Sequence, residues 1–418
     1  MSHNYRSVTF LLGLIVTAPL YGQKQPGFSR FVVAGDSLSA GYQNSQLIES
    51  GQVHGYANVI ATQAGVDLKL PLLPPPGYPQ IKIIQGHAVD TGFDQTPFGA
   101  LLHKPHTLDF AVPGFTLAAL VGLQPFCNPN PADQFYPIEV MASKILNPTC
   151  STNPPTELLV AATQRPTTAI LWVGSNDALF SLLFGGDPTD GATFSGLYGL
   201  AATTMANASG HLVMANIPDV TLTAYLTSVP KLAAILNLPV FAVQSRLGLN
   251  PGDAVTPYAF PLIQAMGRSL THLPDSDSQG PVVIRAATLA DIRAHVIAYN
   301  AAIAAEAALT GATLVDIYSL INDLAANGVV VGGQKLTTDF MGGLFSLDGV
   351  HPTNTGYAII ANEFIKTMNQ SLHTDIPYAD VAQVSKTDPL IFPDSNPGKY
   401  TGHVDPGMAD CLRRLGRR

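Results

Sequence analysis

The sequence predicts an α/β protein, a three-layer α/β/α sandwich around a central parallel sheet. Short runs that are apolar along their whole length alternate with helical segments. Such runs are typical of parallel strands that are covered by helices on both faces. Polar clusters follow several of the runs directly, and in open parallel sheets binding groups gather at the carboxyl ends of the strands. We therefore expect the functional groups along one edge of this sheet.

Four apolar runs predict the buried strands: residues 31–35, 169–174, 211–217 and 312–317. Residues 108–112 form a further short apolar run that ends at Pro113-Gly114. Helices are predicted between these strands, at 55–65 with a stop at Gly65 and at about 286–310, and a last helix is predicted at about 354–370, after the final strand.

Length alone would permit two or three domains, but the candidate functional motifs are spread from residue 35 to residue 351, which indicates one large domain with insertions. The chain has 418 residues, 46% of them hydrophobic and 12% charged, and its formal net charge is −8. The acidic balance argues against nucleic acid or an anionic membrane surface as the main partner. We expect a domain over 28–370 with insertions at about 66–106, 115–165 and 222–285, and a C-terminal extension over 371–418.

Two of these insertions have a recognisable composition. Residues 222–285 are apolar and rich in Leu and Pro, which predicts a helical insertion that roofs the cleft. Residues 124–157 are rich in Pro, Asn and Cys, which predicts a surface excursion.

The first 22 residues resemble a secretory signal. Arg6 precedes an apolar stretch from residue 8 to residue 20. That stretch is shorter than the roughly 20 apolar residues of a comfortable membrane span, although a retained N-terminal anchor is the alternative. We expect export, either secreted or periplasmic, without a stable membrane span after cleavage. An exported chain permits a disulfide between Cys127 and Cys150, which leaves Cys411 over.

Two short motifs carry the chemistry. Ser37 lies in Gly-Asp-Ser-Leu directly after the first predicted strand, and Asp348 lies three residues before His351. A serine hydroxyl attacks a carbonyl only with a base within reach and an acid that orients the base. The pattern therefore predicts a serine hydrolase with Ser37 as nucleophile, His351 as base and Asp348 as the orienting acid.

Four blocks in order resemble the GDSL-type esterases and lipases of the SGNH hydrolase superfamily in their secreted bacterial form. They are Gly35-Asp36-Ser37-Leu38, Ala111-Val112-Pro113-Gly114, Gly174-Ser175-Asn176-Asp177 and Asp348-Gly349-Val350-His351-Pro352.

The resemblance implies roles for five residues. Ser37, Asp348 and His351 match the catalytic triad. The backbone N–H groups of Ser37 and Gly114 and the side-chain amide of Asn176 match the donors of an oxyanion hole. No metal and no cofactor is implied.

Other interpretations of the same residues remain. Asn176 at a helix start is also a capping residue, although Asp177 is the better cap. An α/β-hydrolase has the same Ser…Asp…His order, but its Gly-x-Ser-x-Gly motif is missing. Residues 275–280 resemble half of a calcium loop, yet Ala286 stands where the acidic ligand is needed.

The predicted function is hydrolysis of small-molecule or lipid carboxylic esters through an acyl-enzyme on Ser37. The alternatives are a carbohydrate (acetyl) esterase or an acyltransferase with the same triad, and a binding protein that has lost activity. Trp172 is the only tryptophan and lies in a predicted strand, which does not favour an exposed aromatic platform for sugars.

Overall fold

The structure is a computed structural model. It describes residues 27–75, 77–78, 81–84, 87–90, 107–130, 136–267, 269, 271–278 and 280–391. The predicted signal segment and Cys411 lie outside the described residues.

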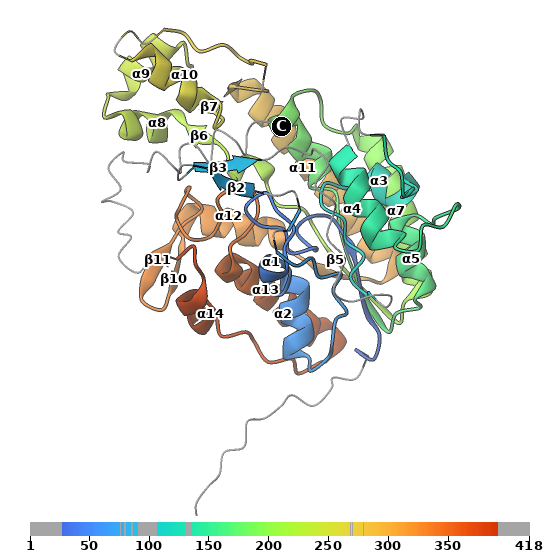
Figure 1. The fold of residues 1–418 in the computed structure, drawn as a ribbon. Coiled ribbons are helices and arrows are strands. Elements are labelled where there is room, and N and C mark those ends of the chain that lie inside the picture. The colour runs from blue at the N-terminus through green and yellow to red at the C-terminus, as the bar shows by residue number, and fades with distance from the viewer. Residues whose placement is uncertain are drawn as a thin grey trace, which may run out of the picture.

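Four parallel strands form the central sheet in the order β1-β4-β5-β9 (Figure 1). Their bounds are Phe31–Gly35, Thr168–Trp172, His211–Ala215 and Thr313–Val315. The predicted apolar run 108–112 lies along the other side of β1, where Asp109 makes a parallel bridge with Val33. The order of connection therefore reverses at β1. The gap between the ends of β1 and β4 is the point where ligands bind in such sheets.

Both faces of the sheet are buried, and neighbouring residues of one strand enter different cores. Val32 and Ala34 pack in the first core, together with residues of α3, α5, α7 and α11. Val33 packs in the second core, together with residues of α2, α12 and α13. Apolar residues at every position of a strand are stable only with helices on both sides. The predicted three-layer sandwich is confirmed.

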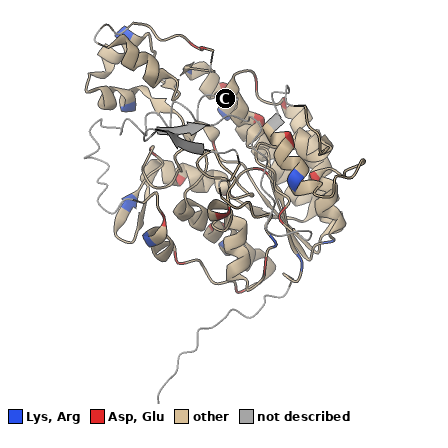
Figure 2. Ribbon diagram, viewed as in Figure 1, with Lys and Arg blue, Asp and Glu red and all other residues tan. Residues whose placement is uncertain are grey.

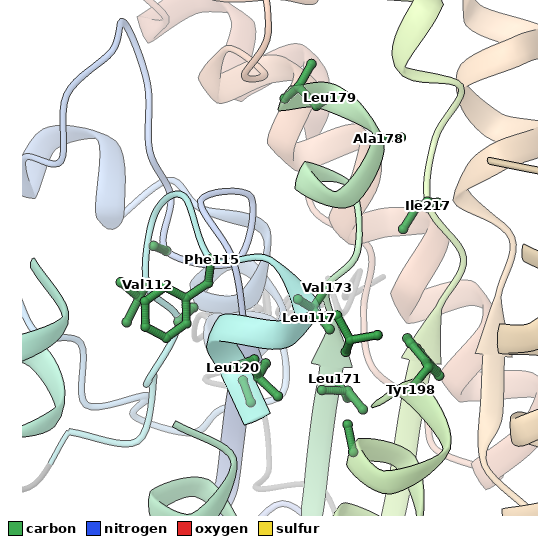
Figure 3. Packing of buried hydrophobic residues seen from close by; sticks show 14 of the residues in the cluster. Val112, Phe115, Leu117, Leu120, Leu171, Val173, Ala178, Leu179, Tyr198 and Ile217 are labelled. Carbon is green, nitrogen blue, oxygen red and sulfur yellow. The ribbon is translucent and has the colours of Figure 1, made fainter. Parts of the chain in front are cut away.

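Helices of the first face are α3 Leu117–Gly122, α4 Tyr136–Leu146, α5 Glu157–Thr163, α7 Gly191–Ala208 and α11 Ala286–Thr310. Figure 1 shows α3, α4, α5 and α7 together on one side of β5, with α2 and α13 on the other side. Figure 3 shows the core beside α3, where Leu120 lies close to Leu171 of β4.

Helices of the second face are α2 Tyr56–Gln63, α12 Ile317–Asn327 and α13 Asn354–Leu372. Shorter elements connect or cover these layers: α1 Glu49–Gln52, α6 Asn176–Phe184, η1 Val220–Leu222 and α14 Val381–Thr387. Two small antiparallel sheets lie beside them, β2 Ile81–Ile84 with β3 His87–Asp90, and β10 Val329–Val331 with β11 Gln334–Leu336.

The predicted helical insertion over 222–285 has its own small core. Its helices are α8 Val229–Leu236, α9 Val240–Leu247 and α10 Ala259–Met266. A short sheet lies within the insertion and brings its two ends together, with β7 Ala254–Val255 between β6 Thr227–Ser228 and β8 Val283–Ile284. Figure 1 shows α8, α9 and α10 as a group above the main body.

The prediction of a surface excursion at 124–157 is wrong in part. A disulfide joins Cys127 and Cys150, whose Cα atoms lie 5.4 Å apart. Between them runs α4, and its Met141, Ala142 and Ile145 are buried in the first core. Proline and asparagine punctuate the segment, but the apolar positions of α4 recur at helical spacing and require a partner surface.

Charged residues are scattered over the described ribbon in the view of Figure 2. Among the described residues, no helix is both long enough and apolar enough to cross a membrane.

Candidate active site

Ser37 lies in a single helical turn that begins where β1 ends. The Asp36 carboxylate accepts a hydrogen bond from the Leu38 N–H at 3.0 Å, and the Ala40 N–H donates to the Asp36 carbonyl at 3.0 Å. Asp36 therefore stabilises the turn. Ser37 is only 7% exposed and lines the cleft described below.

Asp348 and His351 are in direct contact within one loop. The His351 Nδ1 lies 2.8 Å from Asp348 Oδ2. The other carboxylate oxygen, Oδ1, accepts the backbone N–H groups of Val350 and His351, each at 2.8 Å. A donor at Nδ1 leaves the His351 Nε2 as an acceptor, which is the tautomer that a serine base requires.

Burial raises the pKa of the Asp348 carboxyl, but the His351 imidazole and the hydrogen bonds from His351 and Ser45 outweigh burial. The pKa of Asp348 consequently lies below its ordinary value. The carboxylate stays ionised beside the imidazole, so it can stabilise the positive charge that His351 gains when it accepts a proton.

A tight turn at residues 43–46 holds the acid from its other side. Asn44 and Ser45 have φ of 52° and 57°, and the backbone pairs Gln43 with Gln46 across the turn. The Ser45 N–H donates to Asp348 Oδ2 at 2.8 Å, and the Asn44 side chain accepts the Leu347 N–H at 2.9 Å. The sequence does not predict this turn clearly. The asparagine at position 44 is its one sequence signal, because asparagine adopts positive φ more readily than most residues.

Gly114 lies in the turn that follows the run 108–112, which lies beside β1. Its φ is +85°, and the Phe115 N–H donates to the Val112 carbonyl at 3.2 Å. Proline followed by glycine with positive φ is typical of a type II turn. A Cβ at this position would lie 2.6 Å from Cδ1 of Ile138 in α4, so only glycine fits between the turn and that helix.

Asn176 is the first residue of α6, directly after β4. Its side-chain Nδ2 donates to the Phe115 carbonyl at 2.8 Å. That bond uses one of the two amide hydrogens and ties Asn176 to the residue after Gly114. Asn176 itself lines the cleft together with Ser37.

The interpretation of Asp177 as the helix cap is wrong. The N-cap of α6 is Ser175, which makes no side-chain capping bond. The Asp177 carboxylate instead accepts the Leu117 N–H at the start of α3 at 2.8 Å and the Thr189 hydroxyl at 2.9 Å. Burial raises the pKa of Asp177, and these bonds offset part of that rise. A tertiary contact takes the carboxylate that local capping rules would assign to its own helix.

The cleft at the end of the sheet has two lobes that meet at the reactive groups. The inner lobe offers about 570 Å³ of space between atoms and the insertion lobe about 980 Å³, each including space that is open to solvent. Five residues line both lobes: Ser37, Asn176, Leu179, Val350 and His351. Gly114 and Asp348 line the insertion lobe alone.

Glu157 is a buried residue behind the nucleophile turn that the sequence analysis missed. It is the first residue of α5, and its Oε1 accepts the Gly35 N–H at 2.6 Å. The backbone bonds from Val33 to Leu108 and from Val112 to Gly35 continue the ladder on either side. The Glu157 side chain thus takes the place of a backbone carbonyl acceptor between β1, which precedes Ser37, and the run 108–112, which precedes Gly114.

Burial raises the pKa of Glu157 well above its ordinary value, and the neighbouring Asp109 and Asp36 carboxyls raise it further. Burial also raises the pKa of Asp36 to about 7 and that of Asp109 to about 8. Burial and the negative charge of the neighbouring acids both disfavour an ionised Glu157, so its neutral form is favoured at neutral pH. The periodicity of α5 gives no sign of this role, because it depends on a tertiary contact.

Among the described residues, no group of three or more His, Cys, Asp and Glu side chains is placed to hold a metal ion.

Comparison with known proteins gives the family. The model of the GDSL-like lipase/acylhydrolase family matches residues 31–364. No curated protein matches the sequence significantly.

Solved structures give weaker likenesses. LAE5, an alpha/beta hydrolase enzyme from the metagenome of Lake Arreo in Spain, is 11% identical with a TM-score of 0.36, covering 81% of this chain and 94% of its own. An extracellular lipase from Streptomyces rimosus is 12% identical with a TM-score of 0.30, covering 82% of this chain and 98% of its own. Both TM-scores lie below 0.5, so neither structure bears on the site.

The family match covers most of the chain, from the first residue of β1 to within α13. The protein belongs to the GDSL-like lipase/acylhydrolase family and is a carboxylic ester hydrolase.

Proposed function

We propose that the protein is an exported serine esterase or lipase that hydrolyses carboxylic esters through an acyl-enzyme on Ser37. The observation that carries this proposal is the contact of 2.8 Å between His351 Nδ1 and Asp348 Oδ2, in a cleft that Ser37 and His351 both line. An ionised acid, an imidazole held in one tautomer and a serine on a rigid turn are the parts that acyl transfer needs.

In the proposed first step, the Ser37 hydroxyl attacks the ester carbonyl while His351 Nε2 takes its proton. The tetrahedral oxyanion is stabilised by the N–H groups of Ser37 and Gly114 and by the Asn176 amide. His351 then gives the proton to the leaving alcohol, and the acyl group remains on Ser37. Asp348 stabilises the imidazolium throughout.

In the second step, water attacks the acyl-enzyme and His351 takes a proton from that water. Collapse of the second oxyanion breaks the bond to Ser37 Oγ and releases the acid, and His351 returns its proton to Ser37 Oγ. An alcohol in the place of water would give transesterification by the same groups, so the acyltransferase alternative differs only in the acceptor.

The proposed export rests on the disulfide between Cys127 and Cys150. Disulfides persist in oxidising compartments and are rare in the reducing cytosol. Retention of the disulfide in protein purified from culture medium or periplasm, with N-terminal sequencing of the mature chain, tests the proposal. A reduced protein recovered from the cytosol with its first residues intact would contradict export.

The test of the reaction is hydrolysis of p-nitrophenyl esters from C2 to C16 by the wild type and by Ser37→Ala. We expect turnover by the wild type and its loss in the variant. A Ser37→Ala protein with near-native turnover would refute the acyl-enzyme mechanism.

A further inference from the structure

The two lobes of the cleft differ in which parts of the chain build them. The inner lobe is lined by residues of the α/β sandwich, among them Ile317 and Ile321 of α12 and Phe345. The insertion lobe is lined by Ile138 of α4 and by Tyr225 and Tyr258 of the 222–285 insertion, with Phe180 and Leu183 of α6 between them.

The insertion lobe is anchored to the catalytic loop. The Tyr225 N–H donates to the Gly349 carbonyl at 2.8 Å, between Asp348 and Val350. Gly349 has a φ of +72°, and a Cβ there would lie 2.7 Å from the Tyr225 nitrogen. The start of the insertion therefore has a fixed position relative to His351, and the insertion lobe that it lines is part of the site.

Both lobes are mostly apolar apart from the reactive groups and a few polar side chains, of which the Ser175 Oγ and the Asp36 Oδ2 of the inner lobe have no hydrogen-bond partner among the described residues. No Lys or Arg of the described residues lines either lobe. In the inner lobe, the Asp219 carboxylate is paired with Arg293 at 2.7 Å and Asp36 accepts the Leu38 N–H. Such walls favour uncharged, apolar groups, because a charged substrate group would lose its hydration without gaining a partner.

The junction of the lobes is the place where an ester carbonyl would react. Ser37, Asn176 and His351 line both lobes there, and Leu179 and Val350 line both as well. An ester carbonyl carbon carries two substituents that point away from each other, the acyl chain and the alcohol. A carbonyl held at Ser37 can therefore extend one substituent into each lobe.

Resting on the proposed function, we infer that the substrate is an uncharged ester with an apolar group on both sides of the carbonyl. The insertion lobe binds one of the two groups and the inner lobe binds the other. Leu183 and Phe180 set the length accepted in the insertion lobe, and Ile321 sets the length accepted in the inner lobe.

Two series of esters test this inference. In the first, the alcohol is ethanol and the acid lengthens from acetate to octanoate; in the second, the acid is acetate and the alcohol lengthens from ethyl to octyl. Both are followed by pH-stat titration below the solubility limit. We expect kcat/KM of the wild type to rise by about fourfold per added methylene in both series until the lobe is filled.

Three matched tryptophan substitutions separate the lobes. Leu183→Trp narrows the insertion lobe, and Ile321→Trp narrows the inner lobe. Leu309→Trp is the control, since Leu309 is 79% exposed on α11 and lines neither lobe. The quantity compared is the slope of log(kcat/KM) against chain length, in which a uniform loss of activity cancels.

We expect Leu183→Trp to lower kcat/KM for the C8 ester of one series by tenfold or more, so that the slope of that series flattens. Ile321→Trp should do the same in the other series, and Leu309→Trp should change neither slope. Phe180→Ala widens the insertion lobe, so it should move the chain-length optimum to longer chains in the series that Leu183→Trp flattens. It replaces Leu183→Trp if that variant does not fold.

The inference is wrong if kcat/KM of the wild type does not change with chain length in one of the series, or if the substitutions in both lobes affect the same series. It is also wrong if acetylated xylo-oligosaccharides are turned over faster than octyl acetate. Ser37→Ala run alongside distinguishes the cases: turnover by that variant refutes the proposed function, whereas its loss with unchanged slopes refutes only the two-lobe assignment.

Discussion

Replacing Glu157 by glutamine is expected to make the protein more stable at alkaline pH without loss of its ester hydrolase activity. The Glu157 side chain is fully buried, and its Oε1 accepts the Gly35 N–H at 2.6 Å. Glutamine has the same shape, keeps a carbonyl oxygen for that bond and does not ionise. Glu157→Leu removes the acceptor, so it leaves the Gly35 N–H buried and unpaired, at a cost of about 1–3 kcal/mol.

The magnitude follows from the pKa of Glu157, which burial raises well above its ordinary value. The unfolded chain releases this proton near pH 4, whereas the folded protein retains it until the raised pKa is reached. The contribution of Glu157 to stability is therefore complete below about pH 4 and is lost as pH rises toward the folded-state pKa. The free energy of unfolding falls by on the order of 1 kcal/mol per pH unit across that window.

The assay is urea unfolding at pH 5 and pH 8 for the wild type, Glu157→Gln and Glu157→Leu. We expect the stability difference between Glu157→Gln and the wild type to grow in favour of glutamine from pH 5 to pH 8, by on the order of 1 kcal/mol for each pH unit below the folded-state pKa of Glu157. Glu306→Gln, near the C-terminal end of the long helix α11, is the control. If Glu157→Gln and the wild type depend on pH identically, the buried acid does not titrate as argued. If Glu157→Leu keeps full activity and stability, Glu157 does not position the nucleophile strand.

Asn176→Ala should lower kcat by about 10²–10³ with little change in KM, because one oxyanion donor is lost. A rise in KM with little change in kcat would show a binding role instead. Asp348→Asn should lower kcat by about 10⁴, because the amide favours the wrong His351 tautomer, and p-nitrophenyl butyrate hydrolysis measures both variants. Asp109→Asn should be more stable than the wild type above pH 8, since burial raises the pKa of Asp109 to about 8 and its contribution is lost as pH rises through that value; equal thermal midpoints at pH 9 would contradict this. Replacing both Cys127 and Cys150 by serine should lower the free energy of unfolding by about 3 kcal/mol, given the loop that they close, and an unchanged urea midpoint would contradict the estimate.

The sequence predicts the sandwich well because its strands follow local rules. Val32, Val33 and their counterparts in β4 and β5 are apolar on both faces, and only a parallel sheet between helices buries such runs. The blocks around Ser37, Gly114 and Asn176 follow β1, the 108–112 run and β4, so the topology brings them to one edge, whereas the loop of His351 lies between β11 and α13.

The parts that the sequence did not predict depend on contacts between distant segments. Glu157 reaches Gly35 across 122 residues, and Ser45 reaches Asp348 across 303. Asp177 stabilises the start of α3 in preference to its own helix. Proline and asparagine residues on either side of helix α4 predict a surface excursion, whereas the burial of α4 depends on the surface beside Gly114.

The central claim is that Ser37 forms a covalent intermediate with His351 as its base. The measurement that tests it most directly is labelling with diethyl p-nitrophenyl phosphate, followed by peptide mass spectrometry. The account predicts one diethylphosphoryl group per chain, on Ser37, with release of an equivalent of p-nitrophenol, parallel loss of esterase activity, and labelling slower by orders of magnitude in His351→Ala. Inactivation with the label on another residue, or full esterase activity after Ser37 is labelled, would contradict it.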